Sequence, residues 1–216
     1  MSVSLRTYCF LDSLQPQLTA HVCSTCRGFW PVPYEAALFV EIAPGMAIHG
    51  LLDRALKATR VHPATIVIER AFGMVMLHSE DKGEVLAAGD AILDALDQSE
   101  ESRMKPRLVT NQVIRAIEPD HAQCVNKIRY GSMITPGESL LIIESEPAAY
   151  IALAANEAEK AANVQLLECH LLALRKRRDQ SQRLIVGTLK EEEFLQPTRR
   201  VGLAARTQSD IDCACH

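Results

Sequence analysis

The sequence predicts an α+β fold in which one module, a mixed β-sheet packed with helices, occurs twice in tandem. Short apolar, β-branched runs typical of strands alternate along the chain with amphipathic stretches of helical period. The first half of the chain also aligns with the second half without a gap from Leu5 to Val61. Self-similarity over such a length is the signature of a tandem duplication.

The internal repeat keeps a constant offset of 103 positions through the first part of each copy. Matched pairs include Leu5 with Leu108, Thr7 with Thr110, Glu41 with Glu144, Lys57 with Lys160 and Val61 with Val164. Near residue 172 the offset changes to 109, so the second copy carries roughly six extra residues around 173–182, and insertions collect at exposed turns.

In the first copy, apolar and β-branched runs predict strands over residues 5–11, 37–42, 61–68 and 74–77. A short helix is expected to begin at Pro16, which suits a first helical turn, and to end before Gly28 as its C′ residue. A longer helix over 46–60 follows from the spacing of its apolar residues, and another is expected over 83–96.

The polar stretch 97–107, interrupted by Pro106, is interpreted as a linker between a first domain, 1–104, and a second, 105–216. The second domain is expected to repeat the first. Its predicted strands cover 108–114, 139–144, 164–172 and 183–187, and its helices 147–162 and 191–205, the last weakened by Pro197. The polar tail 206–216 is expected to be disordered.

Composition excludes several classes of protein. At 216 residues, 48% of them hydrophobic, the chain can bury a substantial core. A net charge of −4 argues against general nucleic-acid binding. No signal peptide is expected, and no apolar run is long enough for a membrane span. The seven cysteines are odd in number and scattered, so we expect reduced thiols in the cytoplasm.

Several longer motifs resemble a known family. They are Leu5–Pro16, Val40–Met46, Ala55–Ala58, Ile68–Gly73 and Glu146–Lys160. Together they resemble the shell proteins of bacterial microcompartments, and among these the circularly permuted tandem-domain shell proteins of carboxysomes, the CcmP-like group. The resemblance runs from about residue 4 to 172 and, more loosely, to about 205. It departs from the family at 173–182, where a basic run replaces the expected small-aromatic-Gly turn.

The resemblance implies a homotrimer of two-domain chains, a pseudohexamer that tiles into the carboxysome shell in the cytoplasm and serves carbon dioxide fixation. It implies a gated central pore lined by Glu69, Arg70, Phe72 and Gly73. It also implies contacts at the tile edges through Lys57 and Lys160, other shell proteins as partners, and trimers that can stack face to face. No catalytic residue, cofactor or metal belongs to this interpretation.

A Glu-Arg pair at a strand end has a physical rationale as a gate. Three copies around an axis would form a charged ring, and such rings commonly set pore selectivity. An exposed ion pair is worth only about 0–1 kcal/mol, so paired and unpaired arrangements would be close in free energy. Because arginine binds phosphate and carboxylate, we hypothesise passage of a small anionic metabolite such as ribulose bisphosphate or phosphoglycerate. By the repeat, Leu172 and Ala173 replace the pair in the second copy.

Two other interpretations stay open. Duplicated modules could form a small-molecule-binding regulatory protein, or an enzyme could use Cys23 and Cys26, which have the spacing of a redox or metal pair. The second copy lacks this pair, and neither it nor the terminal Cys213, Cys215 and His216 is favoured as a site. No nucleophile elbow, phosphate loop or dinucleotide motif occurs.

Overall fold

The computed structural model describes residues 3–69, 71–127, 131–170 and 182–187, the last for the backbone alone. The chain divides into two compact units, Met1–Lys105 and Pro106–His216, each of which is described by itself. No helix in the described part of the chain is long and apolar enough to cross a membrane.

The first unit contains a four-stranded sheet in the order β1-β2-β4-β3. Its strands are β1 (Ser4–Leu11), β2 (Ala36–Ala43), β3 (His62–Glu69) and β4 (Phe72–Ser79). Its helices are α1 (Pro16–Thr25), α2 (Ile48–Ala58), α3 (Lys82–Leu96) and two short 3-10 helices, η1 (Gly45–Ala47) and η2 (Glu100–Ser102).

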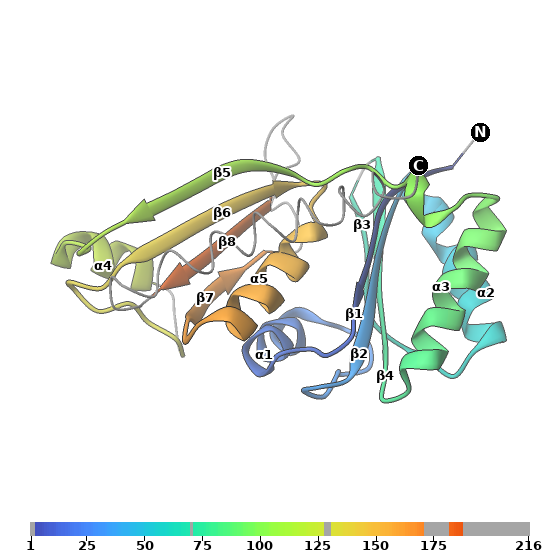
Figure 1. Ribbon diagram of the computed structural model, residues 1–216, viewed down its shortest axis with the longest axis horizontal. Coiled ribbons are helices and arrows are strands. Elements are labelled where there is room, and N and C mark those ends of the chain that lie inside the picture. The colour runs from blue at the N-terminus through green and yellow to red at the C-terminus, as the bar shows by residue number, and fades with distance from the viewer. Residues whose placement is uncertain (1–2, 70, 128–130, 171–181, 188–216) are drawn as a thin grey trace, which may run out of the picture. The chain divides into compact units, whose positions relative to one another are not determined.

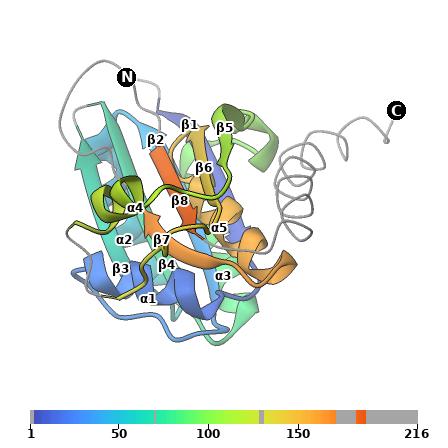
Figure 2. The ribbon, with the colours of Figure 1, turned by 90° about the vertical axis from the view of Figure 1, so that its left-hand side faces the viewer.

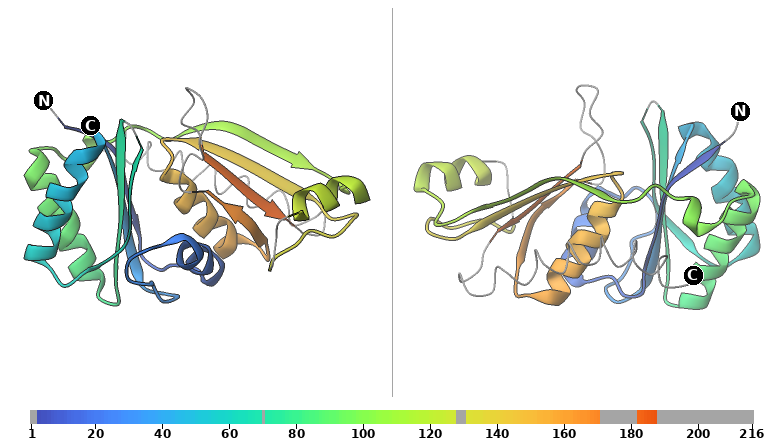
Figure 3. Two further views of the ribbon diagram at one scale, coloured as in Figure 1. Left: turned by 180° about the vertical axis from the view of Figure 1, so that it is seen from behind. Right: turned by 45° about the horizontal axis from the view of Figure 1, so that its top comes forward.

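Helices α2 and α3 cover one face of this sheet, and α1 lies on the opposite side (Figures 1 and 3). Alternate residues of β2 and β4 supply the core beneath α2 and α3, since successive side chains of a strand point to opposite faces. The core includes Leu38, Val40, Ile42, Val75 and Leu77 from the strands and Ile48, Ala55, Val85, Ala88 and Ile92 from the helices.

The prediction of a mixed sheet was wrong for strand pairing, although the α+β architecture is confirmed. All three pairings, β1 with β2, β2 with β4 and β3 with β4, are antiparallel. The helix α2 does connect two parallel strands, β2 and β3, but β4 lies between them. A helix that connects two strands along the chain therefore does not show that these two strands are neighbours in the sheet.

The end of helix α1 corrects one local prediction, and the expected linker makes contacts that the sequence did not indicate. Helix α1 ends at Thr25, and Gly28 is not its C′ residue. Instead the backbone of Gly28 donates to the carbonyl of Ala64 in β3, where an added Cβ would lie 2.2 Å from the Pro63 oxygen. The expected linker is not free of the first unit either, because Gln98 hydrogen-bonds to the backbone at the start of β1.

The second unit repeats the same topology in the order β5-β6-β8-β7, so the predicted duplication of the fold is confirmed (Figure 2). Its strands are β5 (Arg107–Ile114), β6 (Leu140–Glu146), β7 (Gln165–Cys169) and β8 (Gln182–Gly187). Its helices are α4 (Pro119–Asn126) and α5 (Tyr150–Ala161). The predicted helix 191–205, the tail 206–216 and all but the last residue of the predicted insertion lie outside the described residues.

Candidate functional site

The candidate pore residues lie on the hairpin formed by β3 and β4. Glu69 and Phe72 are the last cross-strand pair of this hairpin, at the end of the ladder between β3 and β4. Glu69 and Ala71 are exposed, Phe72 is half-buried and Gly73 is buried. Arg70 lies outside the described residues. The structure therefore places the Glu69 carboxylate at the exposed end of a regular antiparallel ladder.

The end of the hairpin that carries Glu69 is packed against η1 through two glycines. A Cβ on Gly73 would lie 2.2 Å from the carbonyl oxygen of Gly45, and a Cβ on Gly45 would lie 2.3 Å from that of Phe72. Real Cβ atoms do not approach backbone oxygens so closely, so both positions require glycine. The motif Pro44-Gly45 therefore supports the hairpin as well as ending β2.

A buried arginine from β1 also contacts the hairpin. The guanidinium of Arg6 lies over the Phe72 ring, 3.8 Å from its centroid. Its Nε donates to Glu41 Oε1 on β2 at 2.7 Å, and the two side chains are only 11% and 5% exposed. Sequence reasoning missed Arg6, Glu41 and Gly45. The repeat carried one signal, because Glu41 recurs as Glu144 whereas Arg6 is replaced by Val109.

The two candidate edge lysines occupy equivalent helix ends but different surroundings. Lys57, in the last turn of α2, pairs with Asp53 at 2.6 Å, and both side chains are well exposed, at 75% and 61%. Lys160, in the last turn of α5, pairs with Glu157 at 3.2 Å, and these side chains are 29% and 28% exposed. Lys57 is therefore the more accessible of the two.

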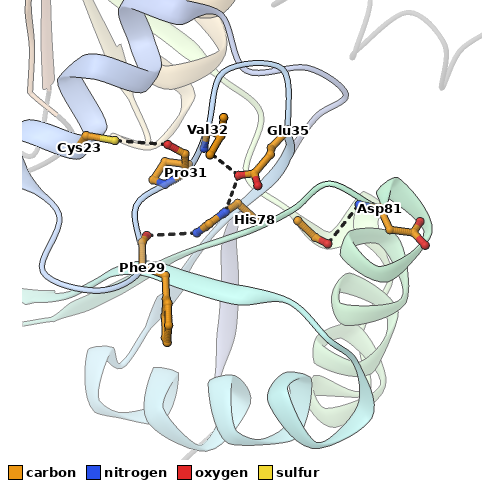
Figure 4. Close-up of polar contacts among 8 residues, drawn as sticks. Cys23, Phe29, Pro31, Val32, Glu35, His78 and Asp81 are labelled. Atoms are coloured by element: carbon orange, nitrogen blue, oxygen red, sulfur yellow. Dashed lines mark hydrogen bonds and ion pairs between the residues drawn. The ribbon is translucent and has the colours of Figure 1, made fainter.

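The surroundings of the cysteine pair do not favour a reactive thiolate. Cys23 and Cys26 lie at the C-terminal end of α1, where the helix dipole disfavours a thiolate. Burial raises the pKa of the Cys23 thiol, which donates to the Pro31 carbonyl (Figure 4). Among the described residues, no group of three or more His, Cys, Asp or Glu side chains could hold a metal ion. Cys213, Cys215 and His216 lie outside that part of the chain.

A polar cluster at the other end of β4 secures the loop after α1. His78 Nδ1 lies 2.7 Å from Glu35 Oε2, and its Nε2 lies 3.1 Å from the Phe29 carbonyl oxygen (Figure 4). The same carboxylate oxygen accepts from the Val32 backbone N–H. Both ring nitrogens of His78 thus lie within hydrogen-bond distance of oxygen atoms in the loop after α1.

Two solved structures have the same fold as this chain. One is the fused permuted hexameric shell protein MSM0275 from the RMM microcompartment, with 35% identity and a TM-score of 0.87 over 94% of this chain and 97% of that one. The other is the double ringed trimeric shell protein MSM0271, also from the RMM microcompartment, with 33% identity and a TM-score of 0.87 over 95% and 97% of the two chains. The fold defines a permuted, two-domain shell protein of a bacterial microcompartment.

Sequence relatives narrow this class. Residues 5–102 match the CsoS1D N-terminal domain family. The carboxysome shell protein CsoS1D of Hydrogenovibrio crunogenus is 50% identical over 77% of this chain and 82% of its own length. The carboxysome shell protein CcmP of Synechococcus elongatus is 45% identical over 78% and 79%. The chain belongs to this family of carboxysome shell proteins, which confirms the predicted family, structural role and location in the microcompartment shell.

Proposed function

We propose that this chain is a non-enzymatic shell tile that assembles as a homotrimeric pseudohexamer, in which the β3–β4 hairpins of three chains line a gated central pore. The observation that carries the proposal is the exposed Glu69 at the end of a hairpin whose adjacent residues are tightly packed. A gate needs mobile charged side chains on a scaffold that keeps its position, and the glycine contact and the Arg6 contact provide such a scaffold.

The permeant is a small anionic metabolite. Arg70 supplies the cation that would attract it, and Glu69 supplies an exchangeable partner that neutralises Arg70 when no anion is present. Because an exposed ion pair contributes about 0–1 kcal/mol, a weakly bound anion can compete for Arg70 and change the population of the open state. Phe72 and Gly73 set the hairpin that presents both charges.

Self-assembly extends beyond the trimer in this proposal. Lys57 and Lys160 lie at tile edges and contact further copies or other shell proteins. In this proposal two trimers also stack face to face. The relative MSM0271 is described as double ringed, which suggests such stacking for that protein. Extended sheets in electron micrographs of the purified protein would support tiling. Saturable binding of a metabolite by a chain that never tiles would favour the regulatory-protein alternative.

The pore is tested by metabolite flux into assembled shells. Glu69→Ala and Arg70→Ala are compared with wild type and with Glu80→Ala, which removes an exposed glutamate just beyond the other end of β4. We expect both tip variants to change the flux of phosphoglycerate severalfold and Glu80→Ala to leave it unchanged. Wild-type flux in both tip variants, with intact trimers, would reject the pore.

A further inference from the structure

We propose that Arg6 is a positioning residue of the pore, which fixes the direction in which the β3–β4 hairpin presents Glu69. The proposal rests on the proposed function of that hairpin and adds a residue that lies far from it in the sequence. Arg6 contacts Phe72, and Phe72 is the direct cross-strand partner of Glu69. Directly opposed residues of an antiparallel pair project from the same face of a sheet.

A β-bulge places Arg6 for this role. The register of β1 on β2 shifts between Leu5 and Thr7, so Arg6 is the extra residue of the bulge. Bulges redirect a side chain out of the regular alternation of a strand. Glu41 fixes the redirected side chain by accepting from Nε, which leaves the plane of the guanidinium over the Phe72 ring. A cation over an aromatic face is attracted by the negative charge of the ring's π face.

The second unit provides an internal comparison. Its register shifts at the equivalent place, between Leu108 and Thr110, so the bulge itself is common to both copies. The bulged residue there is Val109, and Glu144 accepts from the Thr110 hydroxyl at 2.8 Å. The bulge alone therefore does not require arginine. Arginine occupies it in the copy whose hairpin carries the Glu-Arg pair.

The hydrogen bond between Arg6 and Glu41 is accompanied by an unfavourable feature at Thr7. Its buried hydroxyl has no hydrogen-bond partner among the described residues, although the equivalent hydroxyl of Thr110 bonds to Glu144. A buried polar group without a partner is unfavourable and needs an explanation. The explanation is that Arg6 takes the glutamate that a threonine takes in the other copy. The first unit thus lacks a hydrogen bond between Thr7 and Glu41, but it has the contact between Arg6 and Phe72.

The test is amide hydrogen exchange on the full-length protein, read separately at residues 68–73 and elsewhere in the first unit. Arg6→Met removes the charge and keeps a long side chain. Its matched control is Arg103→Met, because Arg103 is an ion-paired arginine of the same unit with a similarly buried side chain, 10% exposed. We expect exchange at 68–73 to rise about tenfold in Arg6→Met alone, with no comparable rise in the rest of the unit.

A second measurement does not depend on how well the fold tolerates Arg6→Met. Arg6→Gln keeps a donor for Glu41 but has no charge to place over the ring, and it should loosen the same amides. Phe72→Leu should do so too, and the double variant Arg6→Met/Phe72→Leu should exchange no faster than either single variant, since both remove one contact.

Unchanged exchange at 68–73, a uniform rise across the unit, or additive effects in the double variant would overturn the positioning role. The pore is judged separately. If Arg6→Met loosens the hairpin while Glu69→Ala and Arg70→Ala leave metabolite flux at the wild-type level, Arg6 keeps its role and the pore assignment fails.

Discussion

The backbone of Gly73 passes that of Gly45 so closely that a Cβ on Gly73 would lie 2.2 Å from the Gly45 carbonyl oxygen. This contact joins the start of β4 to the 3-10 helix that precedes α2. Two segments far apart in the sequence thereby hold the end of the candidate pore hairpin that carries Glu69, and neither can move without the other.

Gly73→Ala should destabilise the first unit because the new methyl group must displace backbone rather than a flexible side chain. We expect a loss of about 1–3 kcal/mol in the free energy of unfolding by urea, the range typical of overpacking. Gly50→Ala is the matched control, since nothing lies within 4 Å of a Cβ at that helical position. It should be neutral or stabilising by up to about 1 kcal/mol. Equal effects of the two variants would show that the close approach is not restrictive.

Thr7→Val and Thr110→Val should have opposite effects on stability although they are the same change at equivalent positions. The Thr7 hydroxyl is buried without a partner in the described structure, so its loss should stabilise the protein by about 1 kcal/mol. The Thr110 hydroxyl donates to Glu144, so its loss should cost about 1 kcal/mol. Urea titrations of both variants measure the difference. The same sign in both would contradict the contrast between the two bulges.

His78→Leu should strongly destabilise the first unit. The substitution removes the ring nitrogens that lie against the Glu35 carboxylate, 11% exposed, and the Phe29 carbonyl oxygen. Leaving buried polar groups without their hydrogen-bond partner costs about 1–3 kcal/mol. His62→Leu is the control, because His62 is exposed and its ring lies 5.0 Å from that of Phe29 and 5.9 Å from that of His78. Thermal unfolding curves that coincide for the two variants would argue against the polar cluster.

Because of Tyr8, the free energy of unfolding should fall at high pH. Burial, followed by the nearby Glu100 and Asp90, raises the pKa of Tyr8 to about 12. The unfolded chain loses the phenolic proton near pH 10 whereas the folded chain retains it, so stability present below pH 10 is lost as pH rises towards 12. Relative to Tyr8→Phe, the wild type should lose about 2 kcal/mol by a pH of about 11.5. Parallel pH profiles for the two proteins would contradict this.

Lys57→Glu should impair tiling without changing stability. Its partner Asp53 is exposed, and an exposed pair contributes about 0–1 kcal/mol, so the unfolding midpoint should stay close to that of wild type. Extended sheets in electron micrographs should become rarer because the edge charge is reversed. Asp53→Asn, which breaks the same ion pair but leaves the lysine, should still tile. If Lys57→Glu forms normal sheets, Lys57 is not a contact at the tile edge.

The sequence by itself determined the duplicated α+β module, most strand and helix positions, and the hairpin with Glu69 before its tip. Local information was enough for these features, because apolar periodicity, turn residues and a constant repeat offset are all read from neighbouring positions. The family likewise followed from contiguous motifs such as Ile68–Gly73.

Tertiary structure decided the features that depend on contacts between distant segments. The sheet is antiparallel because β4 lies between β2 and β3, which a crossover helix alone does not reveal. Gly28 pairs with β3 rather than ending a helix, and Arg6 reaches Phe72 only because a bulge in β1 redirects its side chain. Strand order, bulges and close backbone approaches depend on contacts between segments that are distant in the sequence. The spacing of residues within one segment therefore does not predict them.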